Sequence, residues 1–132
     1  MDVPPSSTPV VCDMTGAPDT VEERLAEYRR LFAQALIGRE RTAEGIRFRL
    51  RAEPGVEEWV RDLAAREKAC CGFYAFEVRA GEGQVIWDCA VIDDDTARAL
   101  LEEFFLLPGT VSRGAAELVG RFTARGLGIV TG

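Results

Sequence analysis

Apolar residues recur every three or four positions in four segments of the chain, which is the spacing of one face of an α-helix. The first segment opens with Thr20 and Glu23, the pair that forms a capping box at a helix start. In the second, Pro54 suits the first helical position and Gly72 provides a natural stop. The four predicted helices span residues 21–36, 54–71, 96–106 and 111–125.

Alternation of apolar and polar residues predicts three strands. In the first strand Ile46, Phe48 and Leu50 point one way and three arginines point the other, so one face is buried and the other is wet and basic. The last strand is apolar on both sides, which predicts a central place in the sheet and puts Trp87 in the core. The three strands span residues 46–51, 73–79 and 85–92.

The last two strands are separated by glycines that indicate a turn. A four-residue turn over residues 80–83 would pair Tyr74 with Cys89 and place the apolar residues of both strands on one face. Cys89 would then lie beside Tyr74, three residues after Cys71.

These elements follow in the order α-β-α-β-β-α-α, which predicts an α+β fold. We expect a small antiparallel or mixed sheet of about three strands, with helices packed on one face. We expect residues 19–132 to form a single domain, with residues 109–132 as a helical extension after a break at Pro108-Gly109. Residues 39–45 are polar and predict a loop. Residues 1–18 hold four of the six prolines and predict an extended arm.

Composition and charge limit the classes of molecule that the protein could bind. The 132 residues carry a formal net charge of −6, which argues against nucleic acid and anionic membranes. No apolar run approaches the ~20 residues that span a bilayer, and no secretory signal is visible. With four unevenly spaced cysteines, we expect a cytoplasmic protein with reduced thiols. Arginine greatly outnumbers lysine, as is typical of GC-rich bacterial genomes.

The adjacent cysteines mark the change from helix to strand and suggest a metal site. Glu67 precedes Cys70 and Cys71 by three and four residues, so its carboxylate can approach both thiols on a helix. The expected register brings Cys89 to the same end of the sheet, and Cys12 could add a fourth ligand. Because the chain has no histidine, such a site would consist mainly of sulfur and suit a soft metal or metalloid ion. Free cysteine is also commonly buried, so core packing is the competing interpretation of Cys70 and Cys89.

Two other functions fit the same sequence. The aromatic residues could line a pocket for a small organic molecule, with Phe76 and Trp87 in its wall and Glu67, Asp88 or Arg47 as polar groups. Such a protein would bind a small molecule or catalyse a step of a biosynthetic pathway. A dimeric interaction module is the remaining alternative. Cys70 and Cys71 lie at the end of a predicted helix, where the helix dipole disfavours a thiolate. This position weighs against either cysteine as a catalytic nucleophile.

Residues 67–76 carry the motif E-x-x-C-C-x-F-x-x-F, which resembles a motif of short, largely uncharacterised bacterial proteins. The resemblance covers about residues 12–105. It departs from that family at Gly72, where the family has proline, and at Tyr74, where it has phenylalanine. Some of those proteins occur beside heavy-metal-responsive regulators, so the resemblance implies a shared fold and a link to metal.

Overall fold

The structure is a computed structural model that describes residues 1–131, and it is an α+β fold. Within that range it has four α-helices, one short 3₁₀ helix and six strands. The helices are α1 (Val21–Ala35), α2 (Val56–Cys70), α3 (Asp95–Thr110) and α4 (Ala115–Ala124), and the 3₁₀ helix is Val111–Arg113. The strands are β1 (Val11–Asp13), β2 (Leu36–Arg41), β3 (Ile46–Arg51), β4 (Tyr74–Gly81), β5 (Gln84–Val91) and β6 (Gly128–Val130).

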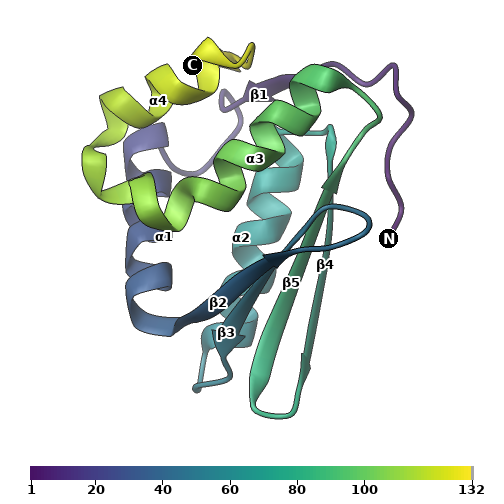
Figure 1. Ribbon diagram of the computed structural model, residues 1–132. Helices are drawn as coiled ribbons and strands as arrows, with labels where there is room; N and C mark the ends of the chain where they lie inside the picture. The colour runs from purple at the N-terminus through teal and green to yellow at the C-terminus, as the bar shows by residue number, and fades with distance from the viewer. Residues whose placement is uncertain (132) are drawn as a thin grey trace.

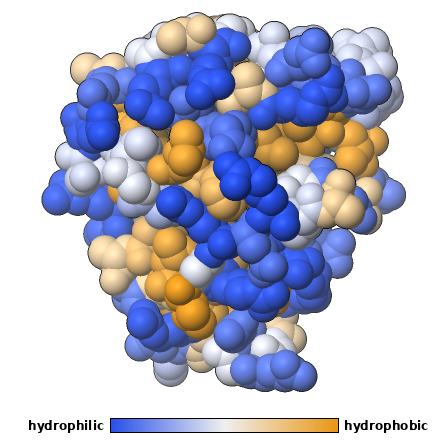
Figure 2. Space-filling view, in the orientation of Figure 1, coloured by the Kyte–Doolittle hydropathy of each residue, from blue (hydrophilic) through white to orange (hydrophobic). Residues whose placement is uncertain are grey.

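Four strands form one antiparallel sheet in the order β2-β3-β5-β4, while β1 and β6 form a separate parallel pair. The helices lie together on one side of the large sheet, with α4 outside α1 and α3 (Figure 1). The face in Figure 2 is mostly hydrophilic, with apolar side chains in separate patches. No helix within residues 1–131 is both long enough and apolar enough to cross a membrane.

Aromatic rings fill the space between the large sheet and the helices. Trp87 is 0% exposed, which confirms its expected place in the core. The ring of Phe104 from α3 meets Trp87 edge-on at 5.6 Å and Phe48 at 5.2 Å. Large side chains buried in this way each contribute about 1.5–3 kcal/mol of hydrophobic stabilisation. This aromatic layer is the contact through which α1 and α3 are held against the sheet.

All seven expected helices and strands occur, but the sheet has a fourth strand that the sequence did not reveal. The loop predicted over residues 39–45 is wrong for its first part, because β2 continues directly from the end of α1. β2 is an edge strand with a free side, so its outer groups can be polar. Arg39 and Arg41 place their guanidinium carbons 5.0 and 4.3 Å from the centre of the Phe105 ring, so these arginines provide packing contacts.

The predicted break at Pro108-Gly109 is also wrong, since α3 continues through both residues to Thr110. Proline removes one helical hydrogen bond, but the burial of neighbouring apolar side chains stabilises this last part of the helix. Leu107 and Val111 are 2% and 8% exposed, so packing outweighs the local preference of the sequence.

The hairpin register differs from the predicted one by two residues. A two-residue turn at Glu82 and Gly83 joins β4 to β5, so Cys89 pairs with Phe76 and not with Tyr74. Glu82 has φ 55° and Gly83 has φ 75°, which are the left-handed values that a tight hairpin turn needs. A shift of two residues keeps every side chain on its expected face, and Cys89 remains buried.

The segment expected to be an extended arm is attached to the domain at β1. Val11–Asp13 pairs in parallel with Gly128–Val130, so chain segments near the two ends lie side by side. Cys12 also forms a disulfide bond with Cys71. The expectation of reduced thiols is therefore wrong for this pair, because the β1–β6 pairing carries Cys12 to the end of α2.

Candidate functional site

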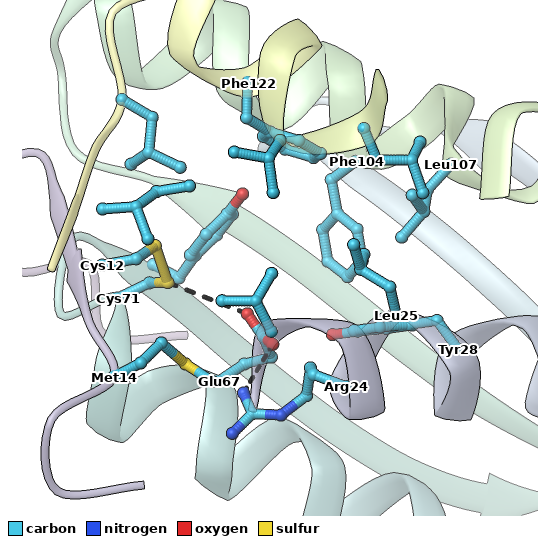
Figure 3. A pocket seen from close by; sticks show the side chains of 16 residues that line it. Cys12, Met14, Arg24, Leu25, Tyr28, Glu67, Cys71, Phe104, Leu107 and Phe122 are labelled. Carbon is cyan, nitrogen blue, oxygen red and sulfur yellow. Dashed lines mark hydrogen bonds and ion pairs between the residues drawn. A yellow bond between two sulfur atoms is a disulfide. The ribbon is translucent and has the colours of Figure 1, made fainter. Parts of the chain in front are cut away.

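A cavity of about 100 Å³ is enclosed by α1, the end of α2, the helices α3 and α4, and the β1–β6 pair. Its walls are mainly aliphatic and aromatic, and the view in Figure 3 shows them around Glu67 and the disulfide. Apolar side chains from α1, α3, α4 and the C-terminal segment supply most of the wall: Leu25, Leu107, Leu118, Phe122, Leu127 and Ile129.

The polar part of the cavity is an ion-paired group at its base. Arg24 is buried, with its side chain 4% exposed, and donates a 2.7 Å hydrogen bond to Oε1 of Glu67. The same guanidinium donates two further hydrogen bonds of 2.7 Å to Asp19. Asp19 also accepts a 3.1 Å hydrogen bond from Arg66, which pairs with two further carboxylates, so four carboxylates share two guanidinium groups. A buried arginine in such a geometry is well paired, and the local excess of negative charge disfavours an anionic ligand.

Glu67 keeps one oxygen free for chemistry. Burial raises the pKa of its carboxyl above the usual range, although the charge of Arg24 opposes this shift. Oε2 lies 3.8 Å from Sγ of Cys71, which has no hydrogen to donate while it is in the disulfide. This oxygen can therefore accept a hydrogen bond from a molecule in the cavity.

Tyr28 faces the cavity from α1 with a buried hydroxyl. The residue is 3% exposed, and among the described residues its side-chain oxygen has no hydrogen-bond partner. In Figure 3 the hydroxyl points towards the Glu67 carboxyl from the opposite side of the cavity. Burial raises the pKa of this phenol well above its usual range, so the group stays protonated and can donate. A buried hydroxyl without a partner costs roughly 1–3 kcal/mol, which a ligand group could recover.

The disulfide forms one wall of the cavity. Cys12 and Cys71 both line it, and they are 59 residues apart in the sequence. Cys71 caps the end of α2, where its backbone N–H donates a 2.7 Å hydrogen bond to the carbonyl of Glu67. The helical spacing of Glu67 and Cys71 predicted that their side chains would meet, and the 3.8 Å separation confirms that proximity.

The other two cysteines lie elsewhere. Cys70 is buried and does not line the cavity, although its Sγ is 3.9 Å from Nη2 of Arg24. Cys89 is 0% exposed in the middle of the sheet, and burial raises the pKa of its thiol well above the usual range. Both are free thiols. The structure thus brings Cys12 to Cys71, whereas the sequence favoured Cys89.

The residues expected to bind a small molecule are divided between three places. Glu67 lines the cavity, whereas Trp87 and Phe76 are in the aromatic layer next to it. Arg47 lies on the opposite face of the sheet, where its Nε donates a 2.6 Å hydrogen bond to Asp88. The pair Arg47–Asp88 faces away from the helices and belongs to a different surface.

Sequence reasoning missed two polar residues of the site. Arg24 and Tyr28 are four residues apart and share the buried face of α1. Tyr28 falls at the helical spacing of Leu25 and Leu31, and this apolar stripe does not reveal its hydroxyl. Arg24 lies beside Leu25, so a charged residue at the edge of that stripe was the available signal. Its carboxylate partners are distant in sequence or precede the helix, so the pattern of α1 alone could not identify the ion pairs.

Comparisons with other proteins add no assignment. No protein-family model, curated protein or solved structure matches the chain. Within residues 1–131, no group of three or more histidine, cysteine, aspartate or glutamate side chains is arranged to hold a metal ion.

Proposed function

We propose that the protein binds a small, mainly apolar molecule with one hydrogen-bond donor group. The apolar part would occupy the cavity, and the donor group would lie between Glu67 and Tyr28. The observation that carries this proposal is an apolar cavity with two polar oxygens available inside it: Oε2 of Glu67 and the hydroxyl of Tyr28. Apolar pockets with a few converging polar groups are the usual form of a small-molecule site.

The size and charge of the cavity define the ligand class. Its volume of about 100 Å³ approaches that of an engineered apolar cavity of about 150 Å³ that holds benzene. A single aromatic ring or a short branched chain is therefore a suitable size. Because four carboxylates, including Asp19 and Glu67, share only the charges of Arg24 and Arg66, the polar end favours a neutral or cationic donor. Alcohols and amines meet this requirement, and carboxylates do not.

A series of four one-ring molecules tests this proposal. Benzyl alcohol, benzylamine, toluene and benzoate share a ring and differ in the group it carries. Titration followed by NMR should give the tightest binding for the alcohol and the amine, weaker binding for toluene and the weakest for benzoate. Loss of a hydrogen bond to a buried polar group costs about 1–3 kcal/mol, so toluene should bind about tenfold more weakly.

Single substitutions test whether the ligand binds in the cavity. Leu25→Trp should block binding by filling the cavity, whereas Ile37→Trp, at an exposed position on β2, should leave it unchanged. Tyr28→Phe should reduce the preference for benzyl alcohol over toluene. Equal affinities for all four molecules, or chemical-shift changes away from the cavity, would refute the proposal.

Soft-ion binding through cysteine, which the sequence predicts for Cys70, Cys71 and Cys89, is the second candidate. It is supported by the contact of Cys12 with Cys71, since the reduced pair would place two thiols beside a carboxylate. The resemblance to proteins found near heavy-metal-responsive regulators agrees with it. The site would then require Cys12 and Cys71, with Cys89 as an optional third ligand.

Mass spectrometry of the reduced protein with one equivalent of Hg(II) or As(III) tests this second candidate. Binding that Cys71→Ser and Cys12→Ser both abolish, and that Cys89→Ala leaves intact, would favour the two-thiol site. Loss of binding in Cys89→Ala would restore the three-thiol site. Retention of the ion by Cys71→Ser at full affinity would exclude both.

A further inference from the structure

We propose that the protein reduces small apolar organic hydroperoxides, with Cys71 as the attacking sulfur, Cys12 as the resolving sulfur and Glu67 as the general base. The inference rests on the proposed function, because the cavity would hold the organic part of the hydroperoxide. It also names a substrate class, since a hydroperoxide is an apolar molecule that ends in one donor group, –O–O–H.

The first support is the position of the disulfide. Cys12 and Cys71 come from segments 59 residues apart, and both sulfurs line the wall of an apolar cavity. A disulfide that only braces the fold has no need to face a cavity. In this position the reduced pair would meet a molecule bound against Leu25 and Phe122, and an oxidised product of Cys71 would have a second thiol beside it.

The second support is the carboxyl beside Cys71. A cysteine at a helix C-terminus is held as a thiol by the dipole, so it needs a base to become a nucleophile. Oε2 of Glu67 is 3.8 Å from Sγ of Cys71, and the reduced thiol could donate its proton there. Burial raises the pKa of Glu67 towards that of a thiol, which makes the carboxylate a stronger base. Arg24 fixes the other carboxyl oxygen at 2.7 Å.

The chemistry balances in three steps. Glu67 takes the thiol proton while the Cys71 sulfur attacks the terminal oxygen of R–O–O–H. The O–O bond breaks, and the departing R–O takes the proton back from Glu67, so the products are Cys71 sulfenic acid and the alcohol R–OH. The Cys12 thiol then attacks the Cys71 sulfur, an S–S bond forms and water leaves. An external dithiol regenerates both thiols by exchange and becomes a disulfide itself.

Tyr28 has a role in the first step. Its hydroxyl faces Glu67 across the cavity, and in the described part of the chain nothing else accepts its hydrogen. It can donate to the oxygen of the departing alkoxide, where negative charge develops as the O–O bond breaks. A donor placed at such a position stabilises the transition state more than the bound substrate.

The experiment uses the full chain, reduced with dithiothreitol and freed of reductant, and tert-butyl hydroperoxide, whose organic part is a short branched chain, as the probe. One equivalent should convert the dithiol to the Cys12–Cys71 disulfide, as peptide mapping would show, with release of tert-butanol. The organic hydroperoxide should react at least about tenfold faster than hydrogen peroxide, because only the former gains contacts with the apolar wall. With dithiothreitol present, the reaction should turn over.

Single substitutions distinguish the roles of Cys12, Cys71 and Glu67. Cys12→Ser should stop at the sulfenic acid, which dimedone would label at Cys71, and Cys71→Ser should not react at this site. Glu67→Gln should slow oxidation by about 10²-fold, the usual loss for a general base. Cys89→Ala is the matched control, because it removes a buried free thiol that does not line the cavity and should keep the wild-type rate. Circular dichroism of each reduced variant against the reduced wild type identifies any that does not fold.

Binding of tert-butanol, measured by NMR on the same samples, separates the two proposals. If this alcohol binds in the cavity but tert-butyl hydroperoxide oxidises Cys71 no faster than it oxidises glutathione, peroxide reduction is wrong and ligand binding stands. If the alcohol does not bind and oxidation is equally slow, both are wrong. Dimedone labelling of Cys70 or Cys89 in place of Cys71 would also overturn the assignment.

Discussion

The ring of Tyr28 in α1 stacks on the indole of Trp87 in β5, with 6.2 Å between the ring centres and 8° between the planes. These two side chains also carry the two buried polar atoms that have no partner within residues 1–131, the hydroxyl of Tyr28 and Nε1 of Trp87. The contact between helix and sheet is therefore made at the cost of two hydrogen bonds. The two rings nevertheless differ in place, since Tyr28 lines the cavity and Trp87 does not.

Trp87→Ala should lower the free energy of unfolding by about 3–5 kcal/mol, because it removes a fully buried large aromatic side chain from the middle of the sheet. Urea denaturation measures the loss. Trp59→Ala is the control, since Trp59 is only partly buried and should cost less. A loss within about 0.5 kcal/mol for Trp87→Ala would mean that the aromatic layer does not hold the core together.

Tyr28→Phe should raise the free energy of unfolding of the ligand-free protein by about 1 kcal/mol, because it deletes a buried hydroxyl with no partner among the described residues and keeps the ring. The same change should weaken binding of benzyl alcohol. Tyr74→Phe, at the other tyrosine of the cavity, is the comparison and should change stability less. Destabilisation by Tyr28→Phe would show that its hydroxyl has a bound partner, such as water.

The carboxyl of Asp88, on the sheet face opposite the helices, makes the stability of the fold depend on pH. Asp88 accepts hydrogen bonds from Arg47 at 2.6 Å and Arg79 at 2.7 Å. Burial acts to raise its pKa, but these two arginines outweigh that effect and hold the pKa below its usual value of 3.8. A carboxyl with a lowered pKa stabilises the fold above its unfolded-state pKa, and that contribution is lost as the pH falls through the folded-state value.

Asp88→Asn should therefore reduce the free energy of unfolding at pH 7, by about 1–3 kcal/mol, and the difference from wild type should shrink as the pH falls below about 4. Urea denaturation at a series of pH values measures this. Asp93→Asn removes a carboxyl that is 91% exposed and should have little effect. A difference that stays constant down to pH 2 would show that the Asp88 charge does not contribute.

Gly45 immediately precedes β3 and lies against the backbone of β5 at Cys89. A Cβ added there would be 2.1 Å from the carbonyl oxygen of Cys89, a backbone atom that cannot rotate away. Gly45→Ala should therefore cost about 1–3 kcal/mol through displacement of one strand. Gly38→Ala, in β2, meets nothing within 4 Å and serves as the control. Equal stabilities for the two variants in thermal denaturation would contradict this close approach.

The parts of the fold that local pattern determines were predictable. β3 has the predicted bounds because apolar and charged residues alternate strictly from Ile46 to Arg51, and this pattern indicates a β-strand with one buried face. β2 was missed because Leu36 and Ile37 are adjacent apolar residues without alternation, and the charged remainder is typical of a loop. An edge strand can use arginines over an aromatic ring in place of apolar residues, and that contact appears only in three dimensions.

The site was predictable only where it is local. Glu67 and Cys71 are one helical turn apart, so their contact follows from spacing. Cys12 reaches Cys71 only because β1 pairs with β6, a contact between segments more than 110 residues apart that no local pattern encodes. The predicted register of Cys89 failed for a related reason, since hairpin pairing depends on turn length, and Glu82 adopts a left-handed conformation that its residue type does not favour.

The pairing of Val11–Asp13 with Gly128–Val130 has a consequence during synthesis. Translation produces β6 last of the described elements, so the cavity cannot be closed by Leu127 and Ile129 until nearly the whole described chain has left the ribosome. Until then Cys12 has no strand to hold it beside Cys71. A nascent chain therefore lacks the part of the wall that Leu127 and Ile129 supply, and a chain halted before β6 would fold its large sheet without gaining the site.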